Sequence, residues 1–233
     1  MRENAPAPVG RHAAALRAVI LDVDGTLVDS TDAHARAWVE ALADQGIDVP
    51  FERVRPLIGM GGDKVLPELT GLSQGNPRGK ALSDRRATIF RERYLSDLRP
   101  FPKARELLER MRGERLTLVV ASSSKEDELR PLLQIAGAAD LVEQWTSADD
   151  APESKPDPDI VAAALQRTGQ AAAAALMLGD TPYDIEAAAR TGVGGVALRC
   201  GGWPDERLAG ALAIYDDPAD LLAHFGASPF ARR

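Results

Sequence analysis

Cysteine is almost absent from this sequence: Cys200 is the only one among 233 residues. A single cysteine excludes a disulfide within the chain and is typical of a reducing compartment. No apolar run approaches the roughly 18 residues that span a bilayer. The amino-terminal segment also lacks an uninterrupted apolar stretch followed by a cleavage site. We therefore expect a cytoplasmic protein with neither a signal peptide nor a membrane partner.

An excess of basic residues is also missing. The formal net charge is −7 and the pI is near 5.1, whereas a nucleic-acid binder needs a basic face that displaces counterions. The residues are 45% hydrophobic and 27% charged, as in an ordinary globular protein. A chain of this length forms one large domain or a domain with a smaller appendage. Residues 1–14, rich in alanine and proline, are expected to form a flexible tail.

Short apolar runs alternate with amphipathic patterns over most of the sequence. Short runs without polar interruption are typical of strands buried on both faces. The pattern predicts strands at 18–21, 116–120, 173–178 and 193–198, and helices at 103–112, 125–136, 157–168 and 182–190. This alternation indicates parallel βαβ units and a Rossmann-like, three-layer α/β fold. The alanine tract 171–175 stays ambiguous, because its composition favours helix although it directly precedes a strand.

Residues 30–98 break this alternation, because no convincing strand occurs there. The apolar spacing predicts three helices: one that Ser30 or Thr31 caps and that ends near Gly46, one over 62–70, and one that carries Phe90, Tyr94 and Leu98. We therefore predict a small all-helical domain at 30–98, inserted into an α/β core formed by 15–29 and 99–233.

Residues capable of chemistry follow the predicted strands. In open α/β sheets, ligands bind beyond the carboxyl ends of the strands. These ends and the loops beside them are expected to bring together Asp22, Asp24, Ser122, Lys155, Asp180 and Asp184.

Asp22 and Asp24 stand one residue apart in extended backbone, so their side chains can approach one site. Several carboxylates desolvated together would raise at least one pKa sharply, and a divalent cation removes that conflict. Oxygen ligands with open coordination positions favour Mg²⁺. Lys155 and the hydroxyl of Ser122 would suit a phosphoryl group beside the metal.

The four motifs resemble those of the haloacid dehalogenase superfamily in order and context. They are DVDGT, the strand-terminal Ser122, Lys155 within SKPDP, and GDTPYD at 179–184. The resemblance covers roughly residues 17–225 and includes the position of the helical insert, which is similar to the C1 cap of subfamily I. It implies an enzyme that transfers a phosphoryl group through an aspartyl phosphate, with Mg²⁺ as cofactor and a small phosphorylated metabolite as substrate.

The resemblance also implies roles for individual residues. Asp22 looks like the nucleophile, and Asp24 looks like the general acid and base. Ser122, Ser123 and Lys155 are expected to bind the phosphate, and Lys155 also offsets the charge of the nucleophile. The implied metal ligands are Asp22, the backbone carbonyl of Asp24, Asp180 and Asp184. For Asp184, a water-mediated contact with the metal and an orienting contact with Lys155 both stay open.

Asp24 favours phosphatases and mutases over dehalogenases, which carry no acid at that position. Within the family, the sequence is similar to the phosphoglycolate phosphatase branch, and a β-phosphoglucomutase-like enzyme is the alternative. Those mutases use a cap arginine for the non-reacting phosphate; here Gly62 takes that position, although Lys64 or Arg55 could substitute. A non-catalytic protein that binds phosphorylated ligands is a third, weaker hypothesis.

The cap residues expected to affect substrate specificity are His34, Gly61, Gly62 and Lys64, three of them in the glycine-rich loop 58–64. Closure of a cap of this type would exclude bulk water and select small substrates. The sequence does not decide between a monomer and a homodimer.

Overall fold

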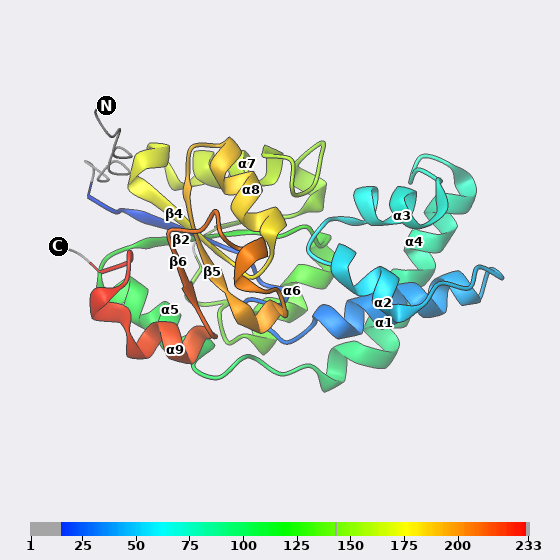
Figure 1. Ribbon diagram of the computed structural model, residues 1–233, viewed down its shortest axis with the longest axis horizontal. Helices are drawn as coiled ribbons and strands as arrows, with labels where there is room; N and C mark the ends of the chain where they lie inside the picture. The colour runs from blue at the N-terminus through cyan, green and yellow to red at the C-terminus, as the bar shows by residue number, and fades with distance from the viewer. Residues whose placement is uncertain (1–14, 143, 232–233) are drawn as a thin grey trace, which may run out of the picture.

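A six-stranded parallel sheet forms the centre of the protein in the computed structural model, which describes residues 15–142 and 144–231 (Figure 1). The strand order is β3-β2-β1-β4-β5-β6. The strands are β1 (Ala18–Leu21), β2 (Thr117–Ala121), β3 (Gln144–Thr146), β4 (Ala175–Gly179), β5 (Gly194–Leu198) and β6 (Ala213–Tyr215). The predicted Rossmann-like α/β fold is confirmed.

Strand β1 lies in the middle of the sheet and pairs with β2 on one side and β4 on the other. All four of its residues are fully buried, which explains why Ala18–Leu21 is an unbroken apolar run. From β1 the chain builds β2 and β3 on one side, then crosses to β4 on the other. The strand order therefore reverses beside β1, and an open α/β sheet binds its ligands at such a point.

Five α-helices cover the two faces of the sheet: α5 (Ala104–Gly113), α6 (Glu126–Ile135), α7 (Asp159–Thr168), α8 (Pro182–Arg190) and α9 (Pro218–Ala223). Val19 and Leu21 belong to the apolar cluster that contains α5, α6 and α9 residues. Ala18 and Ile20 point the other way, into the cluster with α7 and α8. The two-residue period of β1 thus separates two apolar layers around one sheet.

The segment between β1 and β2 is helical. It contains α1 (Thr31–Ala43), α2 (Phe51–Val54), α3 (Gly62–Thr70) and α4 (Pro77–Ile89), which lie together at one end of the molecule (Figure 1). These helices share an apolar cluster of their own, which includes Trp38, Val54, Leu66 and Leu82. The cap is therefore an all-α unit with its own packed interior.

Local details of the cap differ from the predicted pattern. Ser30 precedes α1, but its hydroxyl makes no capping hydrogen bond there and donates to Asp24. The last cap helix begins at Pro77, where the Asn76 side chain accepts from Arg78 N–H. It continues into a π-helical turn over Phe90–Tyr94, so the predicted four-residue spacing to Leu98 does not describe one regular α-helix. The short helix α2 has no clear period and was not predicted.

Two features of the core could be assigned only from the structure. The alanine tract divides, because a 3₁₀ turn covers Ala172–Ala174 and β4 begins at Ala175. The tract is therefore helical at Ala172–Ala174, as its composition favours, and belongs to the strand from Ala175, as its position favours. The three-residue strand β6 was not predicted, because each of its side chains is only partly buried and its apolar signal is short.

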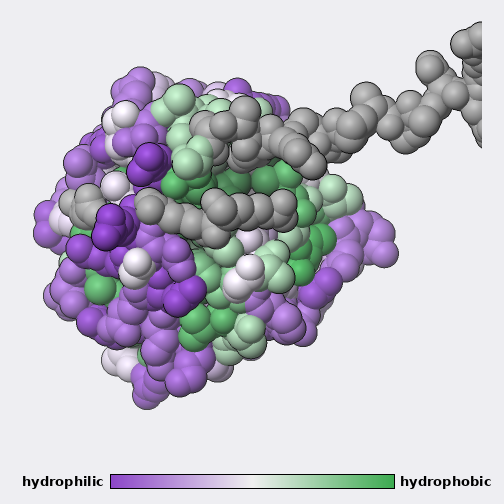
Figure 2. Space-filling model, turned by 90° about the vertical axis from the view of Figure 1, so that its left-hand side faces the viewer, coloured by the Kyte–Doolittle hydropathy of each residue, from purple (hydrophilic) through white to green (hydrophobic). Residues whose placement is uncertain are grey.

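The end of the molecule opposite the cap is seen in Figure 2, which shows apolar residues at the centre of this face and hydrophilic residues along its rim. The strands begin near this end and run toward the cap (Figure 1). Within residues 15–142 and 144–231, no helix has both the length and the apolarity needed to cross a membrane.

Phe90 connects the cap to the main apolar core. Its side chain is fully buried within the cluster that also holds Val28 and Leu98. We expect Phe90→Ala to lower the free energy of unfolding by about 3–5 kcal/mol, because the substitution leaves a cavity. Urea denaturation measures this, with Leu212→Ala as the control: Leu212 is 46% exposed, so its substitution should change stability by less than about 0.5 kcal/mol. Equal effects of the two substitutions would contradict the assigned packing.

Candidate active site

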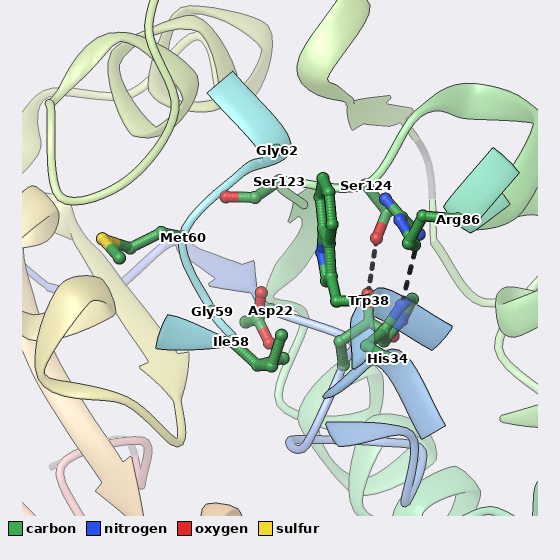
Figure 3. Close-up of a pocket in the computed structure, with 11 residues that line it drawn as sticks. Asp22, His34, Trp38, Ile58, Gly59, Met60, Gly62, Arg86, Ser123 and Ser124 are labelled. Atoms are coloured by element: carbon green, nitrogen blue, oxygen red, sulfur yellow. Dashed lines mark hydrogen bonds and ion pairs between the residues drawn. The ribbon is translucent and has the colours of Figure 1, made fainter. Parts of the chain in front are cut away.

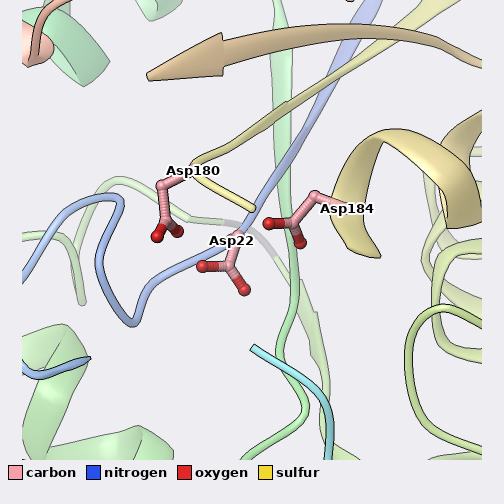
Figure 4. Close-up of side chains that lie close together, drawn as sticks. All are labelled: Asp22, Asp180 and Asp184. Atoms are coloured by element: carbon pink, nitrogen blue, oxygen red, sulfur yellow. The ribbon is translucent and has the colours of Figure 1, made fainter. Parts of the chain in front are cut away.

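Three acidic side chains meet at the carboxyl ends of β1 and β4. Asp22 directly follows β1, Asp180 directly follows β4, and Asp184 lies in the first turn of α8. Figure 4 shows the three carboxylates pointing toward one another, and one oxygen of each lies within 4.8 Å of the others. All three residues are buried. The adjacent register of β1 and β4, in which Leu21 pairs with Leu178, accounts for this convergence.

Lys155 supplies a positive charge to this cluster. Its side chain is fully buried, and its Nζ lies 2.5 Å from Asp22 Oδ1 and 2.8 Å from Asp184 Oδ1. Burial alone would lower the pKa of Lys155, but the charges of Asp184 and Asp22 outweigh it and raise that pKa above its ordinary value. Lys155 therefore stays protonated and holds the two carboxylates in place.

One ammonium group does not balance three carboxylates. Burial is the main cause that raises the pKa of Asp22 to about 7, and the neighbouring charges of Asp184 and Asp24 add to it against the attraction of Lys155. Burial, with the charges of Asp22 and Asp184, also raises the pKa of Asp180 well above its ordinary value. The cluster thus favours either bound protons or a further positive charge.

The arrangement fits a metal ion. Asp180 Oδ2 is buried and has no hydrogen-bond partner among the described residues, while Oδ1 accepts from Thr26 Oγ1 at 2.7 Å. Gly25 and Gly201 leave room beside this oxygen, since a Cβ on either would lie 2.3 or 2.0 Å from Oδ2. An uncoordinated buried carboxylate oxygen next to a second carboxylate is suited to a hard divalent cation.

Asp184 has a different environment from Asp180. Its Oδ2 accepts hydrogen bonds from the backbone N–H and the hydroxyl of Thr181, at 3.0 and 2.7 Å. The Thr181 hydroxyl accepts in turn from Asp184 N–H, which completes a capping box at the start of α8. The other oxygen of Asp184, Oδ1, pairs with Lys155. These contacts favour a role for Asp184 in orienting Lys155 over direct coordination of a metal.

Asp24 turns away from the three acids and toward the cap. Its Oδ1 accepts from Ser30 Oγ at 2.5 Å and lies 2.8 Å from His34 Nε2, and its Oδ2 accepts from Ser124 Oγ at 2.8 Å. Burial would raise the pKa of Asp24, but the attraction of His34 and the hydrogen bonds from His34, Ser30 and Ser124 lower it to about 2. Asp24 thus links a core strand, the core loop after β2 and the first cap helix.

The loop after β2 offers hydroxyl groups to the site. Ser122 is buried, and its Oγ accepts from Ser124 N–H at 3.0 Å. Ser123 Oγ is buried without a hydrogen-bond partner among the described residues, and the residue lines the pocket above Asp22 (Figure 3). A hydroxyl left without a partner is available to an incoming phosphate oxygen.

The cap closes the other side of this pocket. Its lining residues are Asp22, Asp24, His34, Trp38, Ile58, Gly59, Met60, Gly62, Arg86, Ser123 and Ser124. Two of the predicted cap residues, His34 and Gly62, are therefore at the pocket. Lys64 is not in the lining and makes ion pairs with Glu153 and Asp157.

Gly61 has a packing role at the contact between cap and core. A Cβ on Gly61 would lie 2.0 Å from Ser154 Oγ, so the glycine lets the cap loop approach the segment directly before Lys155. The absence of a side chain at Gly61 therefore serves the packing of this loop against the core chain.

Several residues of the site were not assigned from the sequence. Thr26 lies within hydrogen-bond distance of both Asp22 and Asp180, and it is the last residue of the DVDGT motif. Ser124 and Ser30 hold Asp24. Arg86 lies far away along the sequence, in α4, and no local signal marks it as a pocket residue.

Comparison with known proteins agrees with this geometry. The family model of haloacid dehalogenase-like hydrolases matches residues 16–192, which is more than half of the chain. The chain belongs to this family. Over 216 residues, it is 31% identical to a phosphoglycolate phosphatase of Rhodospirillum rubrum, covering 88% of this chain and 89% of the relative. The expected class, a phosphatase enzyme of this family, is confirmed.

Solved structures share the fold over nearly the whole chain. A hydrolase from Pseudomonas syringae is 34% identical with a TM-score of 0.82, covering 91% of this chain and 98% of that one. A putative β-phosphoglucomutase from Bacteroides vulgatus has a TM-score of 0.81, with coverage of 91% and 88%. Because the second is only 23% identical, its likeness concerns the fold alone.

The raised pKa values couple metal binding to pH. Because the folded protein holds a proton on Asp22 up to about pH 7, stability without metal should fall as pH rises from the ordinary carboxyl range through pH 7. A cation needs the deprotonated carboxylates, so Mg²⁺ should raise the melting temperature more at about pH 8 than at about pH 6. Thermal denaturation with EDTA or Mg²⁺ tests this. Asp180→Asn should remove most of the Mg²⁺ response, and equal shifts at both pH values would contradict the coupling.

Proposed function

We propose that this protein is a Mg²⁺-dependent phosphatase that hydrolyses small phosphorylated metabolites through an aspartyl-phosphate intermediate. The observation that carries the proposal is Asp22, held by Lys155 beside the free carboxylate oxygen of Asp180 and directly below the cap pocket. Asp22 and Asp180 would hold the cation, with the backbone carbonyl of Asp24. When bound, Mg²⁺ would neutralise charge on the transferring phosphoryl group.

In the first step, a carboxylate oxygen of Asp22 attacks phosphorus and the bond to the leaving alcohol oxygen breaks. Lys155 keeps Asp22 in position and offsets negative charge as the phosphoryl group transfers. Ser123 offers its unpartnered hydroxyl to a phosphate oxygen. The aspartyl phosphate replaces the original phosphate ester, so the alcohol leaves once it receives a proton.

Asp24 would supply and later accept that proton, while His34 orients its carboxyl group. Arg86 Nη1 lies 3.4 Å from His34 Nδ1, an arrangement suited to the tautomer with its proton on Nε2, which faces Asp24 Oδ1 at 2.8 Å. The anionic phosphate of the substrate would raise the pKa of the nearby Asp24 carboxyl from its value of about 2, and the protonated Asp24 would pass its proton to the leaving oxygen. Left as an anion by that transfer, Asp24 would then take a proton from the water that hydrolyses the aspartyl phosphate.

Two alternatives have less support. A β-phosphoglucomutase-like enzyme needs a cap cation for a second phosphate, yet Gly62 takes that position. Of the two substitutes considered from the sequence, Lys64 pairs with Glu153 and Asp157, and Arg55 binds Asp32 and the Gly201 carbonyl. Arg86, the cap cation that lines the pocket, pairs with Glu128. A non-catalytic binding protein is disfavoured by a complete set of motif residues in one cluster.

Replacement of the nucleophile tests the mechanism. Asp22→Asn should lower kcat by about a thousandfold or more, because the amide cannot form the phosphoenzyme. The fold should persist, because Lys155 retains Asp184. Asp24→Asn is the matched comparison: kcat should fall by about 10²–10⁴, the usual contribution of a general acid and base. Phosphate release under single-turnover conditions measures both, and near-normal turnover by Asp22→Asn would exclude Asp22 as nucleophile.

A product assay separates hydrolysis from transfer. With Mg²⁺ and a hexose 1-phosphate, or with a broad phosphomonoester panel, we expect free phosphate to accumulate and EDTA to stop it. Accumulation of the hexose 6-phosphate would instead support the mutase. Binding of phosphorylated ligands without any phosphate release across the panel would support the non-catalytic alternative.

A further inference from the structure

We propose that the substrate is a phosphate monoester of a small uncharged alcohol or polyol, and that the pocket discriminates against leaving groups that carry a carboxylate or a second phosphate. This inference rests on the proposed phosphatase function and concerns the part of the substrate that leaves. It follows from the charges and contacts of the cap side of the pocket.

Arg86 carries the only fixed positive charge among the described residues that line the pocket. That charge is already balanced. Arg86 Nη1 lies 2.8 and 3.1 Å from the two carboxylate oxygens of Glu128 on α6. Glu128 is only 1% exposed at its side chain and Arg86 13%, so the pair is screened little by solvent. An anionic leaving group would have to compete with Glu128 for this guanidinium.

Two further cap cations, which the sequence suggested as phosphate ligands, are paired elsewhere. Lys64 pairs with Glu153 and Asp157 on the core. Arg55 donates to Asp32 and to the carbonyl of Gly201. Each of these contacts joins the cap to another part of the chain or to its own first helix, and neither residue is among those that line the pocket.

The acidic side of the pocket adds to the effect. Asp22 and Asp24 both line it, and both are anions during at least part of the proposed reaction. A carboxylate placed above them would lose its hydration without gaining a partner of opposite charge, which is costly in a closed site. A hydroxyl group in the same place carries no such penalty.

The remaining lining suits an uncharged polar group. Arg86 Nε is buried with no hydrogen-bond partner among the described residues, so it can donate to a hydroxyl or ether oxygen. The Arg86 guanidinium lies 5.4 Å from the centre of the Trp38 ring, and Ile58 and Met60 supply apolar contacts. N–H donors beside an indole and aliphatic side chains match the mixed C–H and O–H surface of a polyol.

Matched pairs of substrates test the proposal. Phosphoglycolate and 2-hydroxyethyl phosphate differ only by a carboxylate in place of a hydroxymethyl group, as do 3-phosphoglycerate and glycerol 3-phosphate. With Mg²⁺ present, we expect kcat/KM to be higher for the uncharged member of each pair by about tenfold or more. Where a compound is not turned over, its inhibition of p-nitrophenyl phosphate hydrolysis gives a Ki, and the ratio of Ki values compares the binding of the two members, which we expect to favour the uncharged one.

A variant with an uncharged side chain of the same shape shows whether Glu128 causes the preference for uncharged leaving groups. Glu128→Gln should release the charge of Arg86 toward the pocket and shift the ratio toward the carboxylate-bearing member by about fivefold or more. Asp127→Asn is the matched control: Asp127 is on the same helix but pairs with Arg91 in an exposed position, so the ratio should stay unchanged.

The outcomes separate the two proposals. Equal values for the members of each pair, or a preference for the carboxylate, in the wild-type protein would overturn the substrate inference while leaving the phosphatase assignment intact. This comparison of substrates uses only the wild-type protein, so it tests the inference even where Glu128→Gln does not fold. An unchanged ratio in a folded Glu128→Gln protein would overturn the role of Glu128. Absence of phosphate release from every phosphomonoester would instead overturn the proposed function.

Discussion

The site depends on an imbalance of charge: three buried carboxylates surround one buried ammonium group. Lys155 satisfies Asp22 and Asp184 directly, but Asp180 retains an oxygen without a partner among the described residues. Such a cluster is stable only with bound protons or with a further cation. The same conflict would give the site affinity for a divalent ion, and a bound ion would favour the deprotonated Asp22 that the proposed mechanism needs.

The sheet makes this conflict unavoidable. Strands β1 and β4 are adjacent and parallel, and Asp22 N–H donates to the carbonyl of Leu178 at 2.9 Å. The residues that follow the two strands must therefore share one edge, although about two thirds of the chain separates them. The apolar layers on both faces hold β1 in the centre, so neither acid can move away without disrupting the core. Packing in the sheet thus maintains an electrostatically unfavourable arrangement.

The sequence predicted residues that follow strands and two cap residues at the pocket, His34 and Gly62, but missed the contact between Arg86 and Glu128. Asp22 and Asp180 were assigned because apolar runs mark the strands and chemistry occurs at their carboxyl ends. Lys155 was assigned from the SKPDP loop and its resemblance to a motif of the family. Arg86 and Glu128 were not, because their contact spans 42 positions and neither helix reveals its partner. The π-helical turn at Phe90–Tyr94 was likewise hidden, since an α-helical period over those residues fits the same apolar positions.

The contact that closes the cap also limits what the pocket can recognise. Arg86 reaches from α4 to Glu128 on α6, and Asp24 is bound by Ser30 and His34 near the start of α1. Both contacts hold the cap over Asp22, and the first uses a cation that would otherwise face the substrate. A cap secured by ion pairs to the core has fewer free cations for an anionic leaving group. Selectivity for uncharged alcohols would then follow from the way in which this cap is attached.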